Sequence, residues 1–138
     1  MIKAELDHQL VVSVQDRVGT LAEVTQVISS SGINLVAICA YAVDNKGHIM
    51  FVSEDNQKAR QLLAKRGYDL REEEVVLLTL DNKPGTLQAL AAQIADAGID
   101  ITLIYGSVAK GEKVSRIVLI SEDNRAVLTA IKFRKNAR

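Results

Sequence analysis

Two short stretches of the chain alternate apolar and polar side chains. Their apolar positions are Leu10, Val12 and Val14 in the first stretch and Val76, Leu78 and Leu80 in the second. A period of two residues places successive side chains on opposite faces of a strand. Both stretches are therefore predicted to be β-strands.

Each predicted strand is followed by a Gly-Thr-Leu turn and a segment whose apolar residues recur every three or four positions. These residues are Leu21, Val24 and Ile28 in the first segment and Leu87, Leu90 and Ile94 in the second. That spacing is typical of a helix with one apolar face. Gly32 and Gly98 follow the two segments, and glycine readily adopts the left-handed conformation that ends many helices.

The rest of each half predicts further strands and a second helix. Residues 33–43 and 99–109 are rich in residues that favour strands, and turn residues then lead to third strands at 48–53 and 114–121. Segments opening with Glu-Asp-Asn predict helices at 55–66 and 122–133, because Asp or Asn can cap a helix N-terminus. After Gly67, the residues "YDLREEE" predict a fourth strand in the first half.

An internal repeat relates the two halves. The hexapeptide "DRVGTL" at 16–21 returns as "NKPGTL" at 82–87, a shift of 66 residues (85 − 19 = 66). Under that shift, residues 16–38 lie over 82–104 with seven identities in 23 positions. The tetrapeptide "SEDN" at 53–56 returns at 121–124. Such an ordered series of matches identifies a tandem duplication.

The order of elements in the first half is βαββαβ, the ferredoxin-like plan of an α+β protein. The sequence predicts two tandem copies, residues 1–73 and residues 74–138. Too few residues follow the last predicted helix to form a strand, so the second copy is predicted to lack its last strand. The open edge of its sheet then requires a cover, because an unpaired edge attracts further strands.

The strands at 33–43 and 99–109 also predict which side chains face the helices. The inward set is Ile33, Leu35, Ala37, Cys39 and Tyr41 in the first copy and Ile99, Ile101, Leu103 and Tyr105 in the second. The opposite set of the first copy, Val36, Ile38, Ala40 and Ala42, is also apolar. Burial of apolar surface contributes about 25 cal/mol per Å². This apolar face and the open edge together predict a homodimer.

Composition narrows the class of protein. Of the 138 residues 48% are apolar and 25% are charged, as in soluble globular chains, and the formal net charge is zero. A neutral chain with few aromatic residues disfavours nucleic-acid binding. No apolar run suits a membrane span and no signal peptide is recognised. A single cysteine, Cys39, cannot form an internal disulfide. The chain is therefore predicted to be cytoplasmic.

No group of residues indicates catalysis or metal binding. His8 and His48 are far apart in the sequence, and no Cys or His cluster surrounds them. Ser29–Ser31 lie at a predicted helix end with no base at motif spacing. The "REEE" stretch places its carboxylates on alternate faces of a strand. The protein is predicted to have no catalytic residue, no metal and no cofactor.

The turn after the first strand of each copy suits the polar groups of an amino acid. The first turn of a helix has unpaired N–H groups and a partial positive charge, which favour a carboxylate. Gly19 allows close approach to the backbone. Asp16 can accept a hydrogen bond from an ammonium group, and Asn34 can donate or accept. The alternative is structural, with these residues serving only the turn and the strand entry.

Through "DRVGTL…SGINL" and "NKPGTL…AGIDI", the chain resembles the ACT domain family. The resemblance covers both halves, as in the stand-alone tandem ACT proteins of bacteria. It implies a regulatory module whose paired units bind an amino acid where they meet, through the loop before the first helix and the start of the second strand. The ligand-binding residues it implies are Asp16, Arg17, Val18, Gly19, Thr20, Leu21, Asn34, Leu35, Asn82, Pro84, Gly85, Thr86, Leu87, Asp100 and Ile101.

The two copies depart from the family pattern in different ways. Val18 stands where the family usually has proline, Asn82 where it has aspartate, and Asp100 where it has asparagine. The first copy keeps both Asp16 and Asn34. If only one copy binds a ligand, the first is therefore expected to do so.

Two functions follow from the resemblance. The first is a non-enzymatic regulatory or sensor protein that binds an amino acid at the interface of paired ACT units. The second is a ligand-free interaction module, such as a dissociated regulatory subunit of an amino-acid biosynthetic enzyme. Neither function involves a nucleic acid or a membrane.

Overall fold

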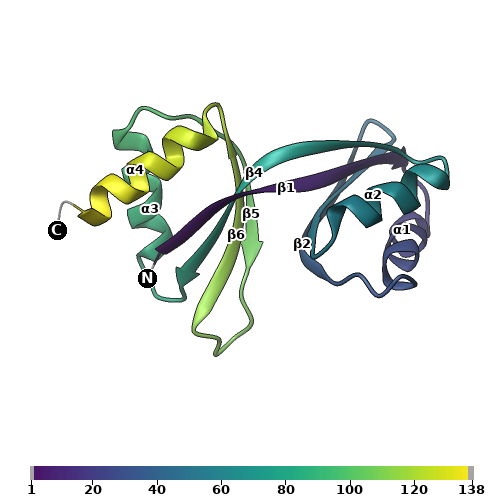
Figure 1. Ribbon diagram of the computed structural model, residues 1–138, viewed down its shortest axis with the longest axis horizontal. Helices are drawn as coiled ribbons and strands as arrows, with labels where there is room; N and C mark the ends of the chain where they lie inside the picture. Colours follow the sequence, from purple (N-terminus) through teal and green to yellow (C-terminus); the bar gives the residue numbers. More distant parts are fainter. Residues whose placement is uncertain (1, 137–138) are drawn as a thin grey trace. The chain divides into compact units, whose positions relative to one another are not determined.

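The computed structural model describes residues 2–136 and confirms the α+β plan. Strands and helices alternate in the predicted order (Figure 1). The elements are β1 (Ile2–Gln15), α1 (Thr20–Ser29), β2 (Leu35–Val43), β3 (Lys46–Ser53), α2 (Asn56–Lys65), β4 (Asp69–Asp81), α3 (Thr86–Asp96), β5 (Ile101–Ser107), β6 (Val114–Ser121) and α4 (Asn124–Asn136).

These elements form two compact units. The first unit is His8–Glu73. The second unit consists of two segments, residues 2–7 and residues 74–136. The expected division at residue 73 therefore misplaces the residues before His8. The long strands β1 and β4 each contribute one half to each unit.

The first unit is a ferredoxin-like sheet covered by two helices. Its strand order is β2-β3-β1-β4, and β3 pairs antiparallel with both β1 and β2. Helices α1 and α2 lie against the same face of these strands (Figure 1). The buried core between the layers consists of Leu10, Val12, Val24, Ile28, Ile33, Ile49, Phe51, Ala59 and Leu63.

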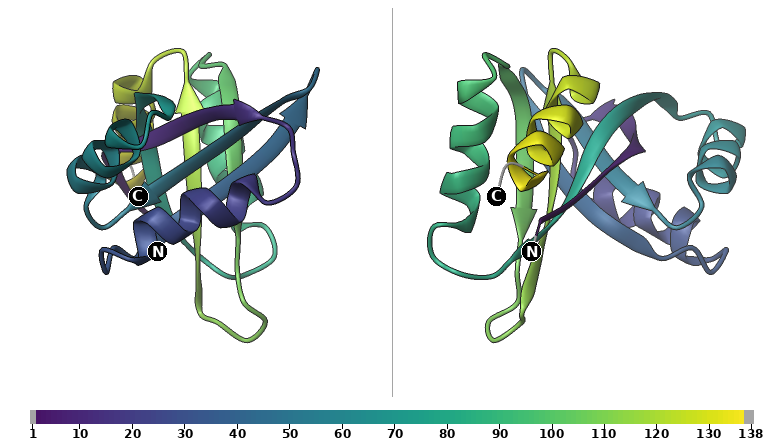
Figure 2. Two further views of the ribbon diagram at one scale, coloured as in Figure 1. Left: turned by 90° about the vertical axis from the view of Figure 1, so that its right-hand side faces the viewer. Right: turned by 60° about the vertical axis from the view of Figure 1, so that its left-hand side comes forward.

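The second unit completes its sheet with the N-terminal half of β1. The strand order continues as β1-β4-β6-β5, and α3 and α4 cover one face (Figure 2). Ile2, Ala4 and Leu6 pack against the core of this unit, at the position of a fourth strand. As predicted, no strand follows α4 within residues 2–136. The cover that this edge was expected to need comes from the same chain, because β1 begins eight residues before the alternation at Leu10 (10 − 2 = 8).

A β-bulge changes which side chains of β2 face the helices. The register of β2 on β3 shifts between Leu35 and Ala37, after which Ile38 lies opposite Phe51. Directly opposed residues share one face of a sheet, and Phe51 belongs to the core. Ile38 therefore lies on the helix side and Cys39 on the other side. The predicted inward set holds for Ile33 and Leu35 and is wrong for Ala37, Cys39 and Tyr41.

The same bulge recurs in the second unit. The register of β5 shifts between Ile101 and Leu103, and Ile104 then lies opposite the core residue Leu119. The prediction holds for Ile99 and Ile101 and is wrong for Leu103 and Tyr105. A bulge inserts one extra residue into a strand, so a period of two assigns every later side chain to the wrong face.

The repeated Ser-Glu-Asp-Asn motif fastens a helix to the sheet in each unit. The Asp55 carboxylate accepts a hydrogen bond from Lys58 N at 3.0 Å, which caps α2 as predicted. Asn56, the first residue of α2, connects the helix to two strands. Its Oδ1 accepts from Ser53 N at 2.9 Å, and its Nδ2 donates to the His8 carbonyl at 2.7 Å. The motif is therefore structural, because it ties α2 to both β3 and β1.

Candidate ligand-binding site

The loop between β1 and α1 leaves the N-terminus of the helix without a side-chain cap. Gly19 is the N-cap residue, with a left-handed φ of 93°, and no side chain caps the helix. That conformation is strained for residues with a Cβ and open to glycine. Thr20 Oγ1 donates to the Arg17 carbonyl at 3.0 Å and so closes the loop. Thr20 N donates to the Arg17 carbonyl at 3.5 Å and Glu23 N to the Gly19 carbonyl at 3.0 Å. The N–H groups between them, of Leu21 and Ala22, are offered to an acceptor from outside the helix.

Arg17 turns back from this loop onto α1. Its Nη1 and Nη2 donate to the two Glu23 carboxylate oxygens at 3.2 and 3.0 Å. These hydrogen bonds, with the charge of Glu23, raise the pKa of Arg17 above its ordinary value. Both side chains are about half exposed, so the pair contributes little to stability. Tyr68 Oη also approaches Glu23, at 3.5 Å. The guanidinium can therefore leave Glu23 at small cost.

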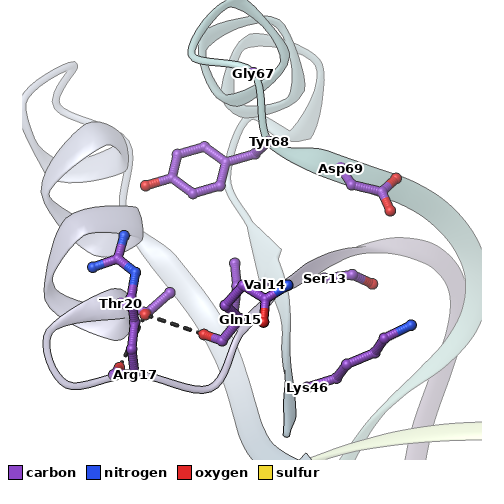
Figure 3. Close-up of a pocket in the computed structure, with 9 residues that line it drawn as sticks. All are labelled: Ser13, Val14, Gln15, Arg17, Thr20, Lys46, Gly67, Tyr68 and Asp69. Carbon is purple, nitrogen blue, oxygen red and sulfur yellow. Dashed lines mark hydrogen bonds between the residues drawn. The ribbon is translucent and has the colours of Figure 1, made fainter.

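A pocket of about 420 Å³ adjoins this loop within the first unit. Its walls come from the end of β1, the start of β3 and the turn that leads into β4 (Figure 3). The lining residues are Ser13, Val14, Gln15, Arg17, Thr20, Lys46, Gly67, Tyr68 and Asp69. We call this the β1–β4 pocket. It combines charged groups with an apolar wall, as small-molecule sites commonly do.

The predicted residue Asn34 lies away from the β1–β4 pocket. Helix α1 separates it from the Gly19 loop, and its ten residues span about 15 Å. Asn34 and Leu35 line a different pocket, of about 520 Å³, beside the outer surface of α1. Within one unit the structure therefore brings Arg17 and Thr20 together but keeps Asn34 apart from them. Asp16 stays near the loop, is exposed, and donates its N–H to Asn45 O at 3.0 Å.

The second repeat keeps the loop geometry and has Lys83 at the position of Arg17, but it has Asn82 in place of Asp16. Gly85 has a φ of 90° and α3 also lacks a side-chain cap. Asn82 is held in place, because its Nδ2 donates to the Glu112 carbonyl at 2.9 Å. Gln15 pairs with Lys46 in the first unit, whereas Asp81 pairs with Val114 in the second. The second unit thus has valine where the first has the pocket lysine.

The remaining predicted residues of the two repeats lie on exposed loops and strand starts. Val18 is fully exposed, and Leu21 and Leu87 are each 47% exposed. Pro84 is exposed and Thr86 half-buried. Asp100 N donates to Glu122 Oε1 at 3.2 Å, and Ile101 packs against the core of the second unit. These residues are placed for local structure or for contact with another molecule.

Sequence reasoning missed the pocket residues that do not belong to the loop. Lys46 follows a hairpin turn in which Asp44 and Asn45 have positive φ angles of 52° and 65°. Such a two-residue turn fixes the register of its strands, so the position of Lys46 beside Gln15 could have been inferred. Tyr68 and Asp69 carried no comparable signal, because only the packing of α2 and β4 brings them to the loop.

Metal and membrane sites are not found in the part of the chain that the structure describes. Among residues 2–136, no three Asp, Glu, His or Cys side chains gather closely enough to hold a metal ion. None of the described helices has the length and apolar character needed to cross a membrane.

Comparison with known proteins gives a family match for part of the chain. The sequence profile of the ACT domain matches residues 8–71, which coincide with the first structural unit. Residues 8–71 are thus similar to an ACT domain. The second ACT-like unit lies outside the matched range and is related to the first by the internal repeat. No curated protein sequence matched the chain.

Solved structures share the fold over almost the whole chain. A protein from Bacteroides thetaiotaomicron superposes with a TM-score of 0.88 at 24% identity, covering 96% of this chain and 90% of that one. The ligand-free regulatory subunit of aspartate kinase from Thermus thermophilus gives 0.69 at 19%, covering 96% and 95%. The regulatory subunit of aspartate kinase from Thermus flavus gives 0.62 at 19%, covering 95% and 94%. The two-unit architecture is therefore shared beyond the residues matched by the family profile.

Proposed function

We propose that the protein is a non-enzymatic regulator that binds a free amino acid in its first ACT unit. The observation that carries this proposal is the glycine-capped N-terminus of α1 beside the β1–β4 pocket. A carboxylate can accept hydrogen bonds from the first-turn N–H groups, and the partial positive charge there favours it. The match of residues 8–71 to the ACT domain profile supports the same ligand class.

The first test is a thermal-shift screen with the twenty free L-amino acids. A ligand that binds only the native state stabilises it by about 2.7 kcal/mol at 100 times its Kd. That stabilisation should raise Tm by roughly 5–10 °C. Glycine methyl ester, which lacks the free carboxylate, serves as a control and should leave Tm unchanged. The absence of any shift across the twenty amino acids would contradict the proposal.

A second candidate function is that of a ligand-free regulatory subunit. It is favoured by the fold shared with two regulatory subunits of aspartate kinase over 95% or more of this chain. Such a subunit would form a complex with an amino-acid biosynthetic enzyme while its Tm stays insensitive to every amino acid. The same screen therefore separates the two candidates.

We also propose that two copies associate. The open edge of the second unit no longer supports this expectation, but the edge strand β2 does. Ile38, Tyr41 and Val43 are between 42% and 52% exposed, and β2 carries no charged residue that would discourage pairing. Sedimentation equilibrium at micromolar concentration should give about twice the 15.0 kDa chain mass. Val43→Lys should shift the protein toward monomer, whereas Val108→Lys, on an exposed loop, should not.

A further inference from the structure

The loop that precedes α3 is tied to the hairpin between β5 and β6 by one residue, Asn82. Asn82 N donates to the Lys113 carbonyl at 2.8 Å, and Asn82 Nδ2 donates to the Glu112 carbonyl at 2.9 Å. Its backbone and its side chain therefore hold two successive carbonyl groups of the hairpin. Asn82 stands at the repeat position of Asp16, since 82 − 16 = 66.

The first repeat keeps only the backbone half of this tie. Asp16 N donates to the Asn45 carbonyl at 3.0 Å, as Asn82 N does to the Lys113 carbonyl. The preceding carbonyl of the first hairpin is that of Asp44. The Asp16 side chain cannot donate to it, because an ionised carboxylate only accepts hydrogen bonds. The side chain at this position therefore fastens the loop to the hairpin in the second repeat alone.

We propose that Asn82 excludes amino-acid ligands from the loop of the second repeat, so that only the loop of the first repeat contributes to a binding site. This inference rests on the proposed function, because it names the residue that decides which of two similar loops takes the ligand. It concerns only the groups that the loop itself contributes. The ligand carboxylate keeps its place at the helix N-terminus.

The helix N-termini of the two repeats offer equivalent donors to that carboxylate. In α3, Thr86 N donates to the Lys83 carbonyl and Ala89 N donates within the first turn. The N–H groups of Leu87 and Gln88 remain for an acceptor from outside the helix, as the two N–H groups at the same positions of α1 do. The carboxylate therefore does not distinguish the repeats, and the difference arises at the ligand ammonium group.

The ammonium group meets different partners in the two loops. Asp16 presents a carboxylate, whose charge-assisted hydrogen bonds are about twice as strong as those of a neutral acceptor. Asn82 is neutral, and its Nδ2 group already donates to the hairpin. An ammonium group at this amide finds one neutral acceptor oxygen and gains no charge pairing. The second loop is therefore expected to bind at least about 10-fold more weakly than the first.

Two-dimensional NMR of the backbone amides in the full chain tests the difference between the loops. The probe is an equimolar mixture of the twenty L-amino acids, added in increasing concentration. The amide signals of Leu21 and Ala22 should shift with this mixture. Those of Leu87 and Gln88, at the same positions of α3, should stay in place.

A reciprocal exchange of the two residues tests the cause. Asp16→Asn gives the first loop the residue of the second and should raise the concentration for half-maximal shift at least about 10-fold. Asn82→Asp removes the side-chain tie, supplies a carboxylate, and should make the amides of Leu87 and Gln88 respond to the mixture.

Two control variants separate the tie from the charge. Asn82→Ala removes the bond to the Glu112 carbonyl and supplies no acceptor. Amide hydrogen exchange in the β5–β6 hairpin should become faster in this variant, while the amide of Leu87 stays unresponsive. Ala91→Glu adds a negative charge on the exposed side of α3 and should leave both loops as they are in the wild type.

The outcomes distinguish this inference from the proposed function. Unmoved amides at both loops overturn the proposed function and the inference together. Equal shifts at the two loops of the wild type overturn the inference and leave the proposed function standing. So does a folded Asn82→Asp chain whose second loop stays silent, because another residue then decides. If that variant does not fold, Asp16→Asn carries the test, and an unchanged response of its first loop overturns the inference.

Discussion

Removal of residues 1–7 is expected to destabilise the second unit while the first unit stays folded. Ile2 and Leu6 pack against the core built by β4, β6, α3 and α4. Full burial of such a side chain contributes about 1.5–3 kcal/mol, and the truncation also leaves β4 with an unpaired edge. A loss of about 3 kcal/mol or more is a large part of the roughly 5–15 kcal/mol that stabilises a domain.

Amide hydrogen exchange should locate this effect. Protection should fall in β5, β6 and α4 and remain in β2 and β3, because the latter strands belong to the His8–Glu73 unit. A double variant, Ile2→Ala with Leu6→Ala, should reproduce most of the loss. The matched double variant Lys3→Ala with Glu5→Ala changes exposed side chains of the same segment and should have little effect. Equal protection in the truncated and full-length chains would show that β1 does not complete the second sheet.

Asn124→Ala is expected to cost the second unit about 2–4 kcal/mol. Asn124 is 9% exposed, and its Oδ1 accepts from Ser121 N at 2.8 Å and from Ser121 Oγ at 3.0 Å. Its Nδ2 donates to the Glu74 carbonyl at 3.2 Å. Alanine leaves these groups buried without their partner, and a buried unsatisfied polar group costs more than the net value of a hydrogen bond.

Urea denaturation provides the measurement, with two controls in the same motif. Asp123→Ala removes the helix cap, in which Asp123 Oδ1 accepts from Ala126 N at 3.1 Å, and should cost about 1 kcal/mol. Asn56→Ala removes the equivalent residue of the first unit, which is more exposed, and should cost less than Asn124→Ala. The explanation fails if Asn124→Ala proves no more destabilising than Asp123→Ala.

Where local pattern and local geometry agree, sequence reasoning was accurate. Val24 and Ile28 of α1 and Leu90 and Ile94 of α3 are buried, because apolar residues spaced at the helical period lie on one face of the helix. Each glycine of the Gly-Thr-Leu turns has a left-handed φ. The prediction of which side chains of β2 and β5 face the helices failed after the bulge. One inserted residue moves every later side chain of the strand to the opposite face, and nothing in the composition of these strands marks the bulge.

The candidate site divides in the same way. Arg17 and Thr20 could be predicted, because a helix N-terminus and its loop are adjacent in sequence. The position of Lys46 was missed although the hairpin turn before it fixes its register. Asp69 could not be predicted, since it reaches the loop through the turn that follows α2. Asn34 was expected at the same ligand where two units meet. Within one unit α1 lies between Asn34 and the loop, and the role of Asn34 stays a prediction.

The sequence by itself determined the tandem repeat, the βαββαβ order and the glycine loops, because these depend on interactions between residues close together in the chain. Only the tertiary structure decided that Ile2, Ala4 and Leu6 complete the second unit. Their alternation with Lys3, Glu5 and Asp7 is written in the sequence, but it states only that a strand forms. Which sheet edge receives that strand depends on where an apolar core lacks a cover, and that is settled by packing between segments some 70 residues apart.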